Sequence, residues 1–154
     1  MTVLLFVLLS LYRIQELPYQ VTDPFVRSFI IEGKEVMTTF KTDAGLYGKY
    51  SGLKGGYLLL NDDGTGEYLD DYSGFALPGC PSGPIRFRWG FILNESGKVV
   101  TFEREYGYSV PVIYESTGEK SFQGCRKKIF VDYLLVRSNG TVEVSSSDDW
   151  KKAP

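Results

Sequence analysis

The chain has 154 residues, enough for one domain with a sizeable hydrophobic core. It carries 17 basic and 19 acidic residues, and its two short basic clusters, Arg126-Lys127-Lys128 and Lys151-Lys152, are typical of a solvated edge or tail. We expect no nucleic-acid partner, because such partners require an extended basic surface. Histidine is absent, which excludes Ser-His-Asp and Cys-His catalytic arrangements and every zinc site that uses histidine.

The first apolar run, VLLFVLLSL from Val3 to Leu11, has the length of a signal-peptide core. It is too short for a transmembrane helix, which needs ~20 apolar residues, so none is expected. No basic segment precedes the run and no small-residue cleavage motif follows it. Residues 1–17 are therefore either the remnant of an export signal, as in a periplasmic or cell-envelope protein, or a first buried element. Residues 18–44 then form an extension with a hairpin around Gly33, and residues 45–154 form the main domain.

Three later segments share a pattern in which apolar residues lead into polar turn residues, a glycine and a second β-rich run. They are LLLNDDGTGEY from Leu58, FILNESGKVVT from Phe91 and LLVRSNGTVEV from Leu134. Because glycine supplies the positive φ that hairpin turns need, each segment predicts a hairpin. The acidic DDGTG stretch raises the alternative of a Ca²⁺ loop. With Gly64 at the sixth position of an EF-hand loop, however, Leu59 would be the first ligand, so we predict a turn and no metal site.

The predicted strands alternate in the way that half-buried strands do. In IRFRWGFIL, from Ile85, the aromatic residues lie on one face while Arg86 and Arg88 lie on the other. In IFVDYLLVR, Val131 and Tyr133 share a face that we assign to the interior. Pro111 predicts that its strand lies at an edge or bulge. Consecutive hairpins predict an all-β fold, an antiparallel meander of about eight to ten strands that closes into a β-barrel.

The chain contains two cysteines, Cys80 and Cys125. Cys80 lies in SGFALPGCPSGP, from Ser73 to Pro84, which is rich in glycine and proline and predicts a long irregular loop. In an exported protein the two cysteines would form a disulfide that pins this loop across one barrel mouth. In the cytosol they would be two reduced thiols in the core.

DGTGEY, followed by FRWGFILNESGKVVTF, resembles the small lipocalin-like (calycin-type) β-barrel domains of exported bacterial proteins. Gly48-Lys49-Tyr50 stands where such domains carry G-x-W near the first barrel strand. The resemblance covers roughly residues 45–145 and implies a lipocalin-like barrel with an apolar cavity. No ligand motif of the family is matched position by position, so the resemblance implies no particular binding residue.

The first functional hypothesis is a non-catalytic binding module that holds a small, partly apolar ligand inside the barrel. Aromatic side chains with a polar tip suit such a cavity, although the same side chains could simply fill the core. Among the residues that we expect to face the interior are Leu59, Phe102, Val112 and Val131. The candidates for the cavity lining are Tyr57, Tyr68, Phe87, Trp89, Phe91, Tyr114 and Tyr133.

The alternative hypothesis is a protein-interaction, inhibitor or immunity-type protein that acts through loops and an edge strand. EREYGYSV offers Tyr106 and Tyr108 on a glycine-containing turn, and tyrosine is common at protein interfaces. An enzyme is not expected, because neighbouring carboxylates such as Asp70 and Asp71 point to opposite faces of a strand and no nucleophile motif is present. No cofactor is expected.

Overall fold

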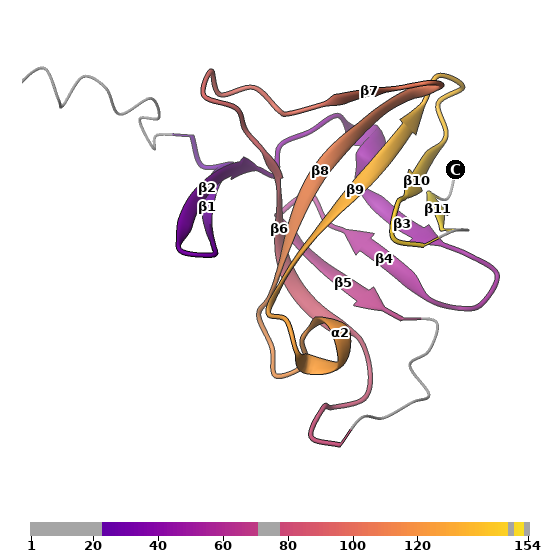
Figure 1. The fold of residues 1–154 in the computed structure, drawn as a ribbon. Helices are drawn as coiled ribbons and strands as arrows, with labels where there is room; N and C mark the ends of the chain where they lie inside the picture. Colours follow the sequence, from indigo (N-terminus) through magenta and orange to yellow (C-terminus); the bar gives the residue numbers. More distant parts are fainter. Residues whose placement is uncertain (1–22, 71–77, 148–149, 153–154) are drawn as a thin grey trace, which may run out of the picture.

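The computed structural model describes residues 23–70, 78–147 and 150–152, and it has eleven strands (Figure 1). The predicted element in residues 1–17 and the stretch 73–77 of the predicted loop lie outside this part of the chain. The strands are β1 (Val26–Ile31), β2 (Lys34–Thr39), β3 (Gly48–Ser51), β4 (Tyr57–Leu60), β5 (Thr65–Leu69), β6 (Ile85–Ile92), β7 (Phe102–Arg104), β8 (Gly107–Ser116), β9 (Ile129–Arg137), β10 (Val142–Val144) and β11 (Lys151–Lys152). Two short helical segments are η1 (Ala44–Leu46) and α2 (Phe122–Cys125).

Eight of the strands form a closed antiparallel barrel, as predicted. They follow one another around the ring in the order β3, β4, β5, β6, β8, β9, β10 and β11. β11 pairs with β3, which joins the two ends of the meander. β6 pairs directly with β8, with Trp89 opposite Tyr114. β7, which lies between them in the sequence, is therefore outside the ring. None of the helices in the described ranges is long and apolar enough to span a membrane.

Glycine with positive φ turns the chain at each predicted hairpin, with values from +76° to +86° at Gly33, Gly64, Gly97 and Gly140. At the acidic DDGTG stretch, Asp63 acts as a turn residue. Its carboxylate accepts hydrogen bonds from the backbone N–H of Thr65 at 2.9 Å and from the Thr65 hydroxyl at 2.6 Å. These bonds hold the pKa of Asp63 below its usual value. The turn prediction is therefore confirmed.

The β1–β2 hairpin lies outside the ring beside β6, and β2 pairs with the end of β6 (Figure 1). Phe29 is fully buried there, under the guanidinium of Arg88, 4.4 Å from the ring centroid. Gly90 makes this close approach possible, because a Cβ at that position would lie 2.2 Å from the Thr38 hydroxyl and 3.4 Å from the Phe29 ring. Gly90 also pairs with Ile113 of β8, which is fully buried although it faces outward. The hairpin thus covers this part of the outer surface.

β7 lies at one end of the sheet order and crosses the upper end of the barrel (Figure 1). It pairs with β8 as far as Ser109, whereas β6 pairs with β8 from Val112 onward. Pro111 lies between these two pairings, so neither β6 nor β7 pairs with it, and the N–H that proline lacks is not needed there. The prediction of an edge strand was wrong, because β8 pairs with β9 from Gly107 to Glu115 and with β7 and β6 on its other side.

The Cys80–Cys125 disulfide is present, with Cα atoms 5.7 Å apart. It joins the loop before β6 to α2 at the lower end of the barrel (Figure 1). Phe122 of α2 is buried, and its ring contacts four aromatic rings of the core. The disulfide thus ties the described part of the predicted loop to α2, and Phe122 anchors α2 to the core.

Candidate functional site

The barrel interior contains most of the predicted aromatic lining. Phe87, Trp89, Phe91 and Tyr114 are at most 1% exposed, and Tyr68 packs against them from β5. Their rings pack closely, with centroids 4.8 Å apart for Phe87–Tyr114 and 5.2 Å apart for Trp89–Phe91. These side chains therefore pack against one another in the described core.

Two of the predicted lining residues, Tyr57 and Tyr133, lie on the outer face instead. In the β3–β4 ladder the fully buried Tyr50 pairs with Leu58, which points Tyr57 outward against the ammonium of Lys49. Tyr133 is 37% exposed. The assignment of both residues to the interior was wrong, because each strand is shifted by one residue from the expected phase.

The same shift affects other residues that were assigned to the interior. Leu58 and Leu60 are buried, whereas Leu59 between them is only partly buried. Val131 is 39% exposed and Phe102 is 44% exposed, so both lie on the outer surface. Val112 is fully buried and faces inward as predicted.

Asp132 lies in the interior, although the alternation of its strand predicted the outer face. Its carboxylate is buried and accepts hydrogen bonds from the Ser146 hydroxyl at 2.6 Å and from the Tyr133 backbone N–H at 2.8 Å. Burial raises the pKa of Asp132 above its ordinary value, and the two hydrogen bonds oppose that rise. A lone aspartate on a strand normally indicates the solvated face, so only the tertiary partner Ser146 reveals its true position.

Two buried donors in the core have no hydrogen-bond partner among the described residues, the Tyr114 hydroxyl and the Trp150 Nε1–H. Both side chains are at most 1% exposed. Burial also raises the pKa of Tyr114 well above its ordinary value, with a further contribution from Asp132. By contrast, the Tyr50 hydroxyl donates to the Leu46 carbonyl at 2.7 Å. The unpartnered pair is the only feature of the described core that favours a bound polar group.

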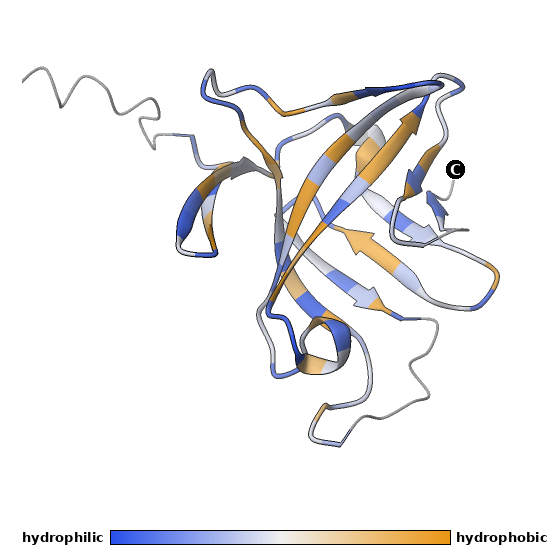
Figure 2. Cartoon of the chain, in the orientation of Figure 1, coloured by the Kyte–Doolittle hydropathy of each residue, from blue (hydrophilic) through white to orange (hydrophobic). Residues whose placement is uncertain are grey.

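The outer face of β9 is apolar along most of its length. Figure 2 shows that hydrophobic residues predominate along this strand. Phe130, Asp132, Leu134 and Val136 face inward, which leaves the alternate row outward. We call this row the β9 outer strip; it consists of Ile129, Val131, Tyr133 and Leu135. Phe102 of β7 extends the strip, since its ring lies 6.4 Å from that of Tyr133.

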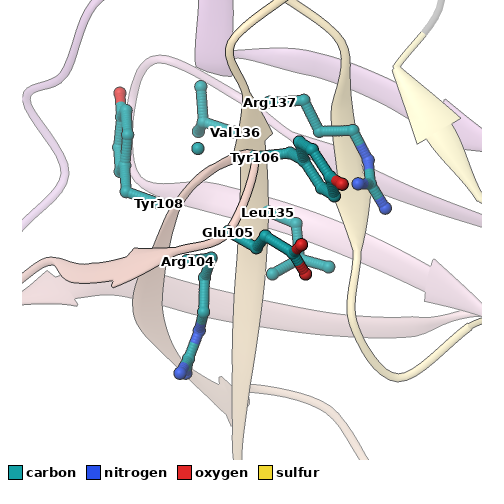
Figure 3. Close-up of a pocket in the computed structure, with 8 residues that line it drawn as sticks. Arg104, Glu105, Tyr106, Tyr108, Leu135, Val136 and Arg137 are labelled. Carbon is teal, nitrogen blue, oxygen red and sulfur yellow. The ribbon is translucent and has the colours of Figure 1, made fainter.

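A surface depression of about 210 Å³ adjoins the upper end of the strip. It lies at the β7–β8 turn and includes both predicted interaction residues, Tyr106 and Tyr108, which are 64% and 39% exposed. Figure 3 shows Tyr106 beside Arg137, whereas Tyr108 lies on the other side of β9 next to Val136. The two tyrosines therefore do not form one aromatic pair, but they border the same depression. Its lining residues are Arg104, Glu105, Tyr106, Gly107, Tyr108, Leu135, Val136 and Arg137.

The carboxylates nearest the strip on β8 and β10 are already paired. Glu143 forms ion pairs with Arg137 at 2.8 Å and with Lys151 at 3.7 Å. This pairing lowers the pKa of Glu143 and raises that of Arg137. Glu115 forms an ion pair with Arg88. Among the described residues, no cluster of three or more acidic or sulfur ligands could hold a metal ion.

The barrel is compatible with the lipocalin-like resemblance of the sequence. Gly48-Lys49-Tyr50 opens the first strand of the ring, and the aromatic ring of Tyr50 is fully buried. The DGTG turn joins two ring strands, as the resemblance implies. No protein-family model, no curated protein and no solved structure matches the chain, so any function must be argued from the geometry described above.

Proposed function

We propose that the protein is a non-catalytic protein-binding module, and that it binds through the β9 outer strip and the adjacent depression. One observation carries the proposal. The described chain has eight large hydrophobic side chains that are exposed, and five of them lie in β7, the β7–β8 turn, β8 and β9. Such clustering on an otherwise charged surface is typical of an interaction site. The five are Phe102, Tyr106, Tyr108, Val131 and Tyr133. Tyr108 pairs with the inward-facing Val136, so it borders the depression without sharing the face of Val131 and Tyr133.

The size of the depression supports a protein partner over a small-molecule ligand. Small-molecule sites usually have volumes of ~300–1,000 Å³. The depression has about 210 Å³, which is closer to the space occupied by one large side chain. Protein interfaces commonly bury such an anchor side chain in a pocket, surrounded by flatter apolar contacts. The strip supplies those flatter contacts.

Site-specific photo-cross-linking tests the proposal. A photoreactive phenylalanine analogue replaces Tyr133 in one variant and Leu53 in a matched control, since Leu53 is 98% exposed and lies in the β3–β4 turn. We expect a discrete cross-linked adduct in the native host at position 133, no adduct at position 53, and loss of the adduct when Val131→Lys is added. Equal labelling at the two positions would contradict the proposal.

A second candidate function is the binding of a small polar ligand within the barrel. It is supported by the unpartnered Tyr114 hydroxyl and Trp150 Nε1–H, because buried donors are normally satisfied. Native mass spectrometry of the protein from its own host would detect a co-purifying molecule. The disulfide supports an exported site of action for either function, because such bonds persist in oxidising compartments.

A further inference from the structure

We infer that the partner presents an apolar row about 20 Å long, with carboxylates beyond both of its ends. This inference rests on the proposed function, since it names the chemistry of the partner that would occupy the β9 outer strip. It follows from the charges at the two ends of the strip, from the pairing of the neighbouring carboxylates, and from the length of the strip itself.

The lower end of the strip is basic. Arg126, Lys127 and Lys128 immediately precede Ile129, the first residue of the strip, and all three are exposed. None of them forms an ion pair with another described residue, so their charges are not neutralised within this part of the protein. A carboxylate of the partner at this position would gain attraction and speed the association.

The upper end of the strip has one cation of the same kind, Arg104. Its Nε donates to the Ser109 hydroxyl at 3.1 Å, and its guanidinium lies 5.9 Å from the Phe102 ring centroid. It forms no ion pair within the described ranges, unlike Arg137, which is neutralised by Glu143. Glu105 also lines the depression, but Figure 3 shows that its carboxylate and the Arg104 guanidinium point in different directions. A carboxylate of the partner can therefore approach Arg104 from the side away from Glu105.

The length of the partner's apolar row follows from strand geometry. The strip runs from Ile129 to Leu135, which is six steps along β9. At about 3.3 Å per residue, the strip is roughly 20 Å long. About seven residues of an extended segment, or ~13 residues of a helix, span the same distance. Alternate apolar side chains of an extended segment would match the period of the strip.

Two synthetic peptides test this inference. Each has nine residues, with leucine, tyrosine and valine separated by threonines; one carries two glutamates at each end and the other carries two lysines. We follow backbone amide shifts of the full chain during titration. The glutamate peptide should shift the amides of β7 and β9 and bind at least ~10-fold more tightly than the lysine peptide. The difference should shrink at high salt, because ions screen exposed charges.

Charge reversal completes the test. The triple variant Arg104→Glu, Lys127→Glu, Lys128→Glu should reverse the preference between the two peptides, whereas Lys34→Glu on β2 should leave it unchanged. Equal binding of both peptides, a preference of the native protein for lysine, or no shifts at millimolar peptide would overturn the inference. Strip-dependent binding to vesicles of anionic lipid, without peptide binding, would also overturn it and assign the strip to a membrane surface. If the cross-link at position 133 persists in the charge-reversed protein, the proposed function stands while the acidic partner does not.

Discussion

Replacing Tyr114 by phenylalanine should stabilise the protein. The Tyr114 hydroxyl is fully buried and has no hydrogen-bond partner among the described residues, so folding removes it from water without compensation. An unsatisfied buried hydroxyl costs about 1–3 kcal/mol. The loss of packing contacts around one oxygen atom offsets part of this gain. We therefore expect the free energy of unfolding to rise by about 1 kcal/mol, and Tm to rise by about 2–4 °C for a chain of this size.

Urea unfolding followed by tryptophan fluorescence measures this change, and Tyr50→Phe is the matched control. The Tyr50 side chain is equally buried, but its hydroxyl donates to the Leu46 carbonyl, so its removal should lower stability by about 1 kcal/mol. Opposite signs for the two variants would confirm the reasoning. If Tyr114→Phe destabilises the protein as much as Tyr50→Phe does, the Tyr114 hydroxyl must have a partner in solution, and the interior ligand gains support over a filled core.

Three further changes follow from the geometry. Replacing both cysteines by serine should lower stability by about 4 kcal/mol, the chain-entropy value for a loop of 45 residues, as measured by urea unfolding; an unchanged midpoint would contradict this. Asp132→Asn should be as stable as the native protein near pH 3 and more stable than it above about pH 4. The pKa of Asp132 is raised in the folded state, so the native protein loses stability when this carboxyl ionises. Urea unfolding across this pH range measures the difference, and a native protein that gains stability over the variant as pH rises would contradict the reasoning. Gly90→Ala should destabilise by about 1–3 kcal/mol and increase hydrogen exchange in the β1–β2 hairpin, whereas Gly45→Ala, whose Cβ meets nothing within 4 Å, should have no such effect.

The fold could be predicted because its signals are local. A glycine within a polar turn marks each hairpin, and the required positive φ is a property of that residue alone. β6 alternates arginine with aromatic residues without ambiguity, so its inward face was predicted correctly. Closure of the barrel followed from the number of consecutive hairpins. The disulfide could be predicted because the chain contains one pair of cysteines.

The candidate site could not be predicted in the same way, because it depends on the phase of strands that have two apolar faces. β4 reads YLLL and β9 reads IFVDYLLVR, and neither sequence distinguishes its inward face by composition. The polar residue in β9, Asp132, indicates the wrong face. It is tolerated inside because Ser146, which lies 14 residues later in the chain, donates a hydrogen bond to it. Such a partner becomes evident only in the folded chain.

The comparison of β8 with β9 gives the strongest reason to expect a partner. Strands that are apolar on both faces normally lie between two apolar layers. On β8, Ile113 of the outer face is fully buried; it pairs with Gly90 of β6, against which Thr38 and Phe29 of the β1–β2 hairpin pack. β9 has the same double-sided pattern, but Val131 and Tyr133 remain 39% and 37% exposed. Burying a fully exposed side chain of this size contributes about 1.5–3 kcal/mol. Because Val131 and Tyr133 are already partly buried, covering the rest of each side chain would contribute a corresponding fraction of that free energy. Within the described chain this burial is incomplete on β9, and a partner that covers the strip would complete it and so stabilise the complex.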